Sequence, residues 1–259
     1  MTVFVCGEEP EDIWCAIYDA WMSRLGHKNV RIEPAGQNRE LFCEYREVVT
    51  SDEKVRKVTD SIRRKLSESV YEEVYKAALS RDAFRGDKIY RFLIYGFAIG
   101  PKAVDLLQIP AVFQLFEMTR RLGREFGHLR EFVRFSQMKE GILLGRIAPE
   151  NDLVMLLAPH FADRMPSENW ILYDCVRKKA AVHRADQGWV MVRADSSEWQ
   201  QRLEQETDEE TFEELWRTFH TSIAIQERTN PRCQRNLLPL RFRPHMTEFQ
   251  QGYSGRVSR

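Results

Sequence analysis

Residues 170–193, WILYDCVRKKAAVHRADQGWVMVR, contain three short, largely apolar runs. The runs cover residues 170–174, 180–183 and 189–193, and Asp186-Gln187-Gly188 forms a turn-like sequence before the third. Short runs separated by polar turns are typical of an antiparallel meander. We therefore expect an antiparallel sheet in the second half of the chain.

The hydrophobic period changes after Gly127. In residues 129–135 the apolar side chains alternate with charged ones, which predicts a strand. Residues 142–147 predict a second strand after a turn at residues 139–141, and residues 151–165 predict a short helix. Before the last expected helix, Thr207 and Glu210 have the spacing of a capping box.

Helical spacing of apolar residues dominates the first half of the chain. A β-branched run at residues 2–6 predicts one strand, and two more extended segments are expected at residues 30–32 and 41–49. The expected helices cover residues 11–25, 54–66, 69–79, 87–100 and 110–124.

These patterns predict an α+β fold with a largely helical N-terminal half and an antiparallel sheet plus helices in the C-terminal half. We divide the chain into a mainly helical region, residues 1–126, and an α+β region, residues 127–259. One continuous domain is the alternative.

Composition excludes several classes of protein. The 259 residues have a formal net charge of zero, which argues against a protein that coats DNA through a global basic field. The five cysteines show no CxxC pair and no signal peptide is recognisable, so we expect reduced thiols in a cytoplasmic protein. No apolar run is long enough to cross a membrane. We find no metal or cofactor signature and predict no cofactor for the chain itself.

Residues 228–245 are rich in arginines and in side-chain amides, and we call them the arginine-rich segment. Guanidinium forks suit phosphate oxygens and guanine edges, and interleaved leucines and Phe242 would anchor the backbone. The alternative is an internal latch in which the arginines pair with the acidic residues of 198–214. The predicted nucleic-acid contacts are Arg228, Asn230, Arg232, Gln234, Arg235, Asn236, Arg241, Arg243 and His245.

Two histidines are candidate general bases. His220 shares a helical face with Trp216 and Glu227, and a histidine beside a carboxylate can accept a proton. His160 and Asp163 are three residues apart on the expected short helix, with Asp174 in the following strand. The alternatives are a histidine bonded to a backbone carbonyl and a structural network of ion pairs.

Three long stretches carry a resemblance to a bacterial family of unknown biochemical function that is catalogued with DNA metabolism and DNA repair. The segment FHTSIAIQERTNPRCQRNLLPLRFRPHMTEF, residues 219–249, resembles its hallmark segment. The stretch LLAPHFADRMPSENWILYDCVRKKAAVH, residues 156–183, is similar to its second motif, and VFVCGEEPEDIWCAIYDAW, residues 3–21, to its start. Members usually carry an Asp-Gly turn where Gly7-Glu8-Glu9 stands here.

The resemblance implies an association with DNA repair. Members of the family are encoded beside a radical SAM protein, and some are fused to a uracil-DNA glycosylase-like domain. This chain has no radical-cluster cysteines, so we expect the stand-alone form, with the radical chemistry in a partner. The family supplies no established catalytic residues.

Three functions remain open at this point. The first is a DNA-binding accessory protein in DNA repair or modification that acts with a radical SAM protein. The second is a glycosylase- or nuclease-like enzyme that uses His220 or His160 with Asp163 or Asp174. The third is a protein–protein adaptor whose arginine-rich segment meets an acidic surface.

Overall fold

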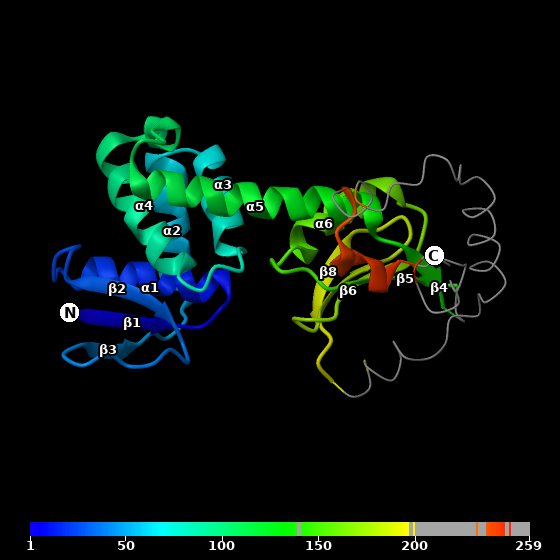
Figure 1. The fold of residues 1–259 in the computed structure, drawn as a ribbon, viewed down its shortest axis with the longest axis horizontal. Coiled ribbons are helices and arrows are strands. Elements are labelled where there is room, and N and C mark those ends of the chain that lie inside the picture. The colour runs from blue at the N-terminus through cyan, green and yellow to red at the C-terminus, as the bar shows by residue number, and fades with distance from the viewer. Residues whose placement is uncertain (139–140, 197–198, 200–231, 233–236, 247–248, 250–259) are drawn as a thin grey trace. The chain divides into compact units, whose positions relative to one another are not determined.

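The structure is a computed structural model, and it describes residues 1–138, 141–196, 199, 232, 237–246 and 249 (Figure 1). The chain divides into two compact units, Met1–Arg124 and Glu125–Arg259. We call them unit 1 and unit 2 and describe each by itself.

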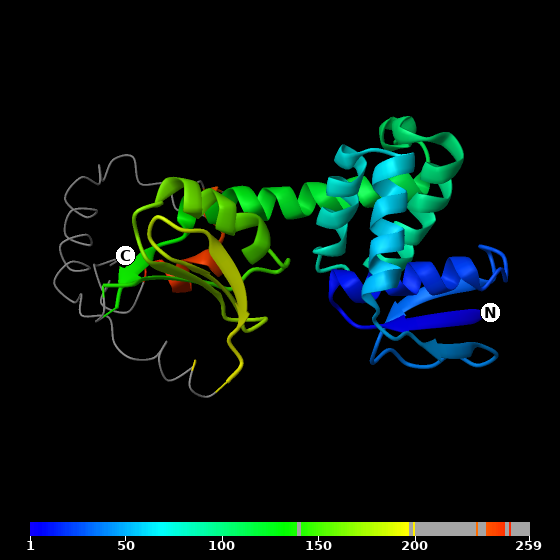
Figure 2. The same cartoon turned by 180° about the vertical axis from the view of Figure 1, so that it is seen from behind.

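Unit 1 is built around a three-stranded parallel sheet in the order β2-β1-β3. The central strand β1 (Thr2–Cys6) is buried along almost its whole length, and β2 (Val30–Pro34) and β3 (Glu44–Glu47) flank it. Parallel neighbours need a crossover connection, which α1 (Pro10–Met22) supplies between β1 and β2. Figure 2 shows α1 lying along one face of this sheet.

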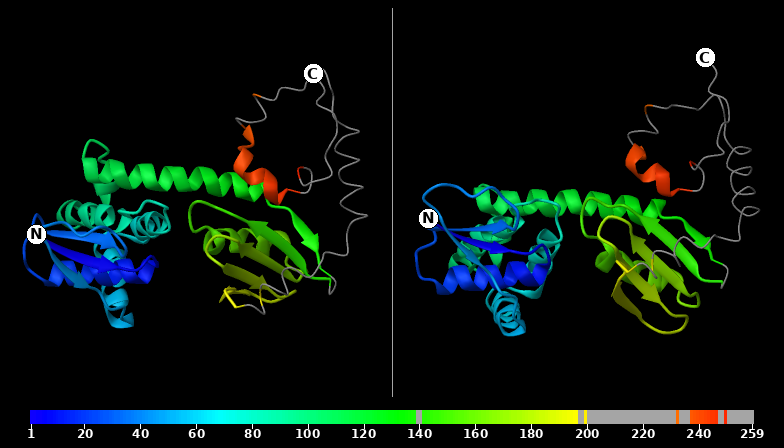
Figure 3. Two further views of the ribbon diagram at one scale, coloured as in Figure 1. Left: turned by 60° about the horizontal axis from the view of Figure 1, so that its bottom comes forward. Right: turned by 90° about the horizontal axis from the view of Figure 1, so that it is seen from below.

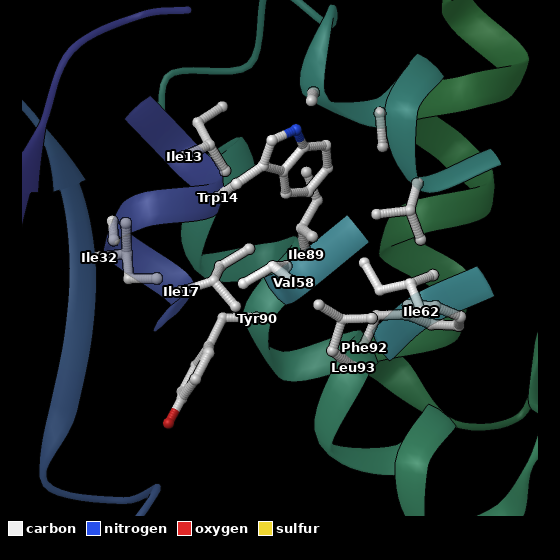
Figure 4. Packing of buried hydrophobic residues seen from close by; sticks show 14 of the residues in the cluster. Ile13, Trp14, Ile17, Ile32, Val58, Ile62, Ile89, Tyr90, Phe92 and Leu93 are labelled. Carbon is white, nitrogen blue, oxygen red and sulfur yellow. The ribbon is translucent and has the colours of Figure 1, made fainter. Parts of the chain in front are cut away.

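Helices complete unit 1, and their apolar stripes meet in one core (Figure 4). The core includes Trp14 of α1, Ile62 of α2 and Phe92 of α4, which are at most 2% exposed. Polar contacts fix α4 on β2, because Asp87 accepts a hydrogen bond from the Ile32 amide at 3.2 Å and Arg91 donates one to the Val30 carbonyl at 2.5 Å. The helices are α2 (Asp52–Lys65), α3 (Glu68–Ala78), α4 (Arg85–Ile99), the 3-10 turn η1 (Pro101–Asp105) and α5 (Pro110–Phe132).

Unit 2 contains a five-stranded sheet in the order β4-β5-β6-β7-β8 (Figure 3). Helix α6 (Val154–Arg164) covers one face and packs its Phe161 ring against Phe135 and Trp170. A 3-10 helix, η3 (Leu240–His245), contacts β5. The strands are β4 (Phe135–Gln137), β5 (Leu143–Ile147), β6 (Trp170–Asp174), β7 (Lys179–His183) and β8 (Trp189–Arg193).

The predicted α+β class is confirmed, with helices dominating the first half and a larger sheet in the second. The meander predicted at residues 170–193 is confirmed as well, since β6, β7 and β8 are consecutive antiparallel neighbours.

Two predictions for unit 2 are wrong. Residues 129–132 belong to α5, and the strand is confined to Phe135–Gln137. Leu129 and Val133 are four residues apart, a spacing that suits a helix as well as a strand, and the Val133 amide does bond to the Leu129 carbonyl at 3.0 Å. The sheet is not wholly antiparallel either. β5 and β6 run parallel, because α6 connects them as a crossover.

Within the part of the chain that the structure describes, no helix has the length and apolar character needed to cross a lipid bilayer.

A pair of glycine substitutions tests the packing of α4 on the sheet. A methyl group at Gly86 would lie 2.9 Å from Cγ2 of Ile32, whereas one at Gly123 would meet nothing within 4 Å. We expect Gly86→Ala to lower the free energy of unfolding by about 1–2 kcal/mol through overpacking. Gly123→Ala should raise it by up to ~1 kcal/mol through helix propensity. Urea unfolding measures both, and effects of the same sign would contradict this packing.

Candidate nucleic-acid interface

The described part of the arginine-rich segment is anchored by apolar side chains. Phe242, in the middle of η3, is 5% exposed, and its ring lies 5.6 Å from that of His128 and 6.4 Å from that of Phe132. Met246, just after η3, is buried too. Phe242 therefore holds the segment against the end of α5, as the sequence predicts. The predicted leucine anchors are wrong for Leu237 and Leu240, which are 67% and 58% exposed.

Arg241 is held by two carboxylates. Its Nη1 lies 2.5 Å from Glu150 Oε1, and its Nη2 lies 3.4 Å from Glu125 Oε1. The side chain of Glu125 is 2% exposed and that of Arg241 is 38% exposed, so only the Glu125 end of this ion pair is shielded from water. Arg241 thus pairs with acids outside residues 198–214, and of that acidic stretch only Trp199 lies in the described part of the chain.

Glu125 also organises the loop before α6. Its carboxylate accepts hydrogen bonds from the amides of Glu150 at 2.9 Å and Asn151 at 3.0 Å, and from Asn151 Nδ2 at 2.6 Å. A buried carboxylate needs such a set of donors to offset its desolvation. Sequence reasoning missed Glu125 because it ended the helix at residue 124. Its place between Leu122 and Leu129 on the apolar face of α5 was the available signal.

Arg243 and Arg232 are placed differently from Arg241. The Arg243 guanidinium lies 4.7 Å from the centre of the Phe249 ring, and its buried Nε has no hydrogen-bond partner among the described residues. Arg232 is exposed. The described part of the segment therefore contains one anchored arginine, one buried donor without a partner and one exposed cation.

His245 closes η3 and is half-buried. Burial lowers its pKa, and the positive charge of Arg146 lowers that pKa further. The ring is consequently neutral at physiological pH, so it can donate or accept a hydrogen bond without adding a charge.

His160 lies on α6 with Asp163, as predicted. Its Nε2 atom is buried and has no hydrogen-bond partner among the described residues. Burial lowers the pKa of His160, the charges of Arg130 and Arg164 lower it further, and Asp163 opposes them. The result is a neutral imidazole next to exposed cations.

Asp174 holds the turn between β6 and β7. Its fully buried carboxylate accepts hydrogen bonds from the amides of Val176 at 2.8 Å and Arg177 at 3.1 Å, and it pairs with the Arg177 guanidinium at 3.1 Å. Burial raises the pKa of Asp174, and Arg177 opposes that shift. Among described residues, no hydrogen bond or ion pair joins Asp174 to His160.

The remaining predicted site residues lie outside the described residues. They are the candidate base His220 and the predicted nucleic-acid contacts Arg228, Asn230, Gln234, Arg235 and Asn236. Where the structure describes the chain, it brings together no group of three or more histidine, cysteine, aspartate or glutamate side chains that could hold a metal ion.

The residues of this site fall within a match to a protein family. A family described as a domain of unknown function, DUF4130, matches residues 84–248. The chain belongs to this family. The match includes α6, the five-stranded sheet and the arginine-rich segment, which together supply the candidate residues. No curated protein matches the chain.

Glu125→Gln tests the anchor of the arginine-rich segment. The amide would place an NH2 group among donors that now face a carboxylate, and Arg241 would lose a counter-ion. We expect the free energy of unfolding to fall by about 3 kcal/mol. Glu131→Gln, an exposed change on the same helix, should shift it by less than ~0.5 kcal/mol. Equal stabilities of the two variants in urea would show that Glu125 is not the anchor.

The pKa of His160 offers a second test. Its folded-state pKa lies below the ordinary value of 6.5, so the unfolded chain binds the proton more tightly. The neutral form of His160 therefore contributes fully to the free energy of unfolding above pH 6.5, and this contribution is lost as the pH falls towards the folded-state pKa. In an NMR titration we expect Arg130→Gln to raise the His160 pKa. Arg184→Gln, at an exposed arginine of the same unit, should leave it unchanged, and identical titrations in both variants would contradict the proposed cause.

Proposed function

We propose that the protein binds DNA through the arginine-rich segment and serves as an accessory protein in DNA repair or modification. The observation that carries the proposal is Arg243, whose buried Nε donor has no partner among the described residues. Leaving a buried donor unpaired costs free energy, and a phosphate that meets the half-buried Arg243 guanidinium would supply the group with an acceptor. Arginines that contact phosphates are the usual means by which such proteins set their position on DNA.

In this proposal the arginines of the segment have different roles. Arg241 keeps η3 in place through Glu125 and Glu150, while Arg232 and Arg243 face the nucleic acid. The neutral ring of His245 adds a hydrogen-bonding group beside them. Arg228, Asn230, Gln234, Arg235 and Asn236 extend the same interface in sequence.

The proposal also includes a radical SAM protein as partner. It rests on the resemblance to a family whose members are encoded beside such a protein. The partner would supply the radical chemistry, and this chain would supply contact with DNA.

A nucleic-acid-processing enzyme is the second candidate. The neutral His160, with its unpartnered Nε2, favours it, because a general base must be deprotonated at the working pH. In this candidate Asp163 assists, and Asp174 supports the neighbouring turn. Cofactor-independent turnover of lesion-containing DNA that His160→Gln abolishes would favour the enzyme over the accessory protein.

Fluorescence anisotropy with labelled single- and double-stranded DNA across a salt titration tests the first proposal. We expect Arg232→Ala with Arg235→Ala to lower affinity at least ~10-fold for all sequences and to reduce the salt slope by about two. The control pair Arg56→Ala with Arg184→Ala removes the same charge at exposed positions elsewhere. Equal losses in both pairs, or no binding at low salt, would refute the assignment. In the latter case a nuclease-resistant complex with a radical SAM protein would favour the adaptor.

A further inference from the structure

Unit 1 contains a pocket of about 580 Å³ that the arginine-rich segment does not use. Helices α1, α2 and α4 form it, and its floor includes the buried Ile17 and Val58. Figure 4 shows these two side chains next to each other among the labelled core residues of unit 1. A volume of this size is typical of sites for small molecules and cofactors.

Aromatic rings form the walls of the pocket. Tyr18 and Trp21 come from α1 and Phe97 from α4, and all three are half-buried. The Trp21 ring is fixed by edge-to-face contacts with Phe97 at 5.4 Å and with Tyr90 at 5.7 Å. A wall of preoriented aromatic rings favours a flat, aromatic ligand over an aliphatic one.

Cations line the rim of the same pocket. Arg64 and Lys65 are exposed and have no ion-pair partner in the described part of the chain, and Lys65 lies 5.4 Å from the centre of the Phe97 ring. Lys57 is already paired with Glu53 at 2.6 Å. The rim therefore offers two uncommitted cations, against the single carboxylate of Asp60.

Polar groups complete the lining. Asp60 and Ser61 lie on α2 between the floor and the cations. The Ser61 hydroxyl donates to the Lys57 carbonyl at 2.6 Å, which leaves its oxygen free to accept. Two acceptors beside aromatic rings suit the amino groups on the edge of a nucleobase.

We infer that this pocket binds a nucleotide unit, with the base against Trp21 and Phe97 and the phosphate at Arg64 and Lys65. An uncharged aromatic ligand would not use the cations, and inorganic phosphate would not use the rings. The unit is either a free mononucleotide or one nucleotide of a single strand, because both present a base and a phosphate. The inference rests on unit 1 alone and does not depend on the proposed DNA contacts of unit 2.

Calorimetric titration of the full-length protein tests the inference with dAMP, adenosine, inorganic phosphate and an eight-residue oligo(dA). We expect saturable binding of dAMP or of the oligonucleotide, with adenosine and phosphate each at least ~10-fold weaker than dAMP where dAMP binds. Arg64→Glu with Lys65→Glu should weaken binding at least ~10-fold. The control pair Lys28→Glu with Arg56→Glu reverses the same charge at exposed positions outside the pocket lining and should bind like the parent.

The outcomes distinguish a free mononucleotide from one nucleotide of a single strand. Saturable dAMP binding that the Arg64/Lys65 pair loses identifies a free nucleotide. Oligonucleotide binding that this pair loses, without dAMP binding, identifies a nucleotide in a strand. The inference is overturned if neither dAMP nor the oligonucleotide binds. It is also overturned if the Arg64/Lys65 variant and the control variant bind equally well. Substitution of Arg232 and Arg235 should leave dAMP binding intact, so failure of the proposed function is distinguishable from failure of this one.

Discussion

The buried carboxylate of Glu125 is the interaction on which the candidate interface depends. Removing a carboxylate from water is costly, and here three hydrogen-bond donors and one guanidinium offset that cost. The loop at residues 149–151 supplies the donors, and Arg241 brings η3 to the same point. Because one side chain contacts both the loop and Arg241, we expect a substitution of Glu125 to disturb both.

Much of the secondary structure could be predicted from periodicity, and the errors have physical causes. The runs at residues 170–193 alternate too regularly for a helix, so β6, β7 and β8 were recognisable. Leu129 and Val133 satisfy both periods, so only the surrounding packing could decide for a helix. The parallel pairing of β5 and β6 follows from the crossover through α6, which no local pattern specifies. Side-chain partners such as Glu125 depend on contacts across 25 or more residues.

The position of each arginine matters more than the number of arginines in the segment. Sequence reasoning treated Arg241 and Arg243 alike, since both flank Phe242. In the structure a single turn of 3-10 helix directs one towards two carboxylates and leaves the other beside Phe249, with a donor that has no partner among the described residues. An anchored cation is already neutralised and contributes little to counterion release, whereas an unpaired one contributes fully. A net charge of zero is therefore compatible with a locally cationic binding surface.

The aromatic pocket of unit 1 and the arginine-rich segment of unit 2 suit different parts of a nucleic acid. In our proposals the segment contacts phosphates through its guanidinium groups, while the pocket offers ring faces that a paired base inside a duplex cannot reach. Most of the pocket lining precedes residue 84, where the family match begins, so the two features need not be inherited together.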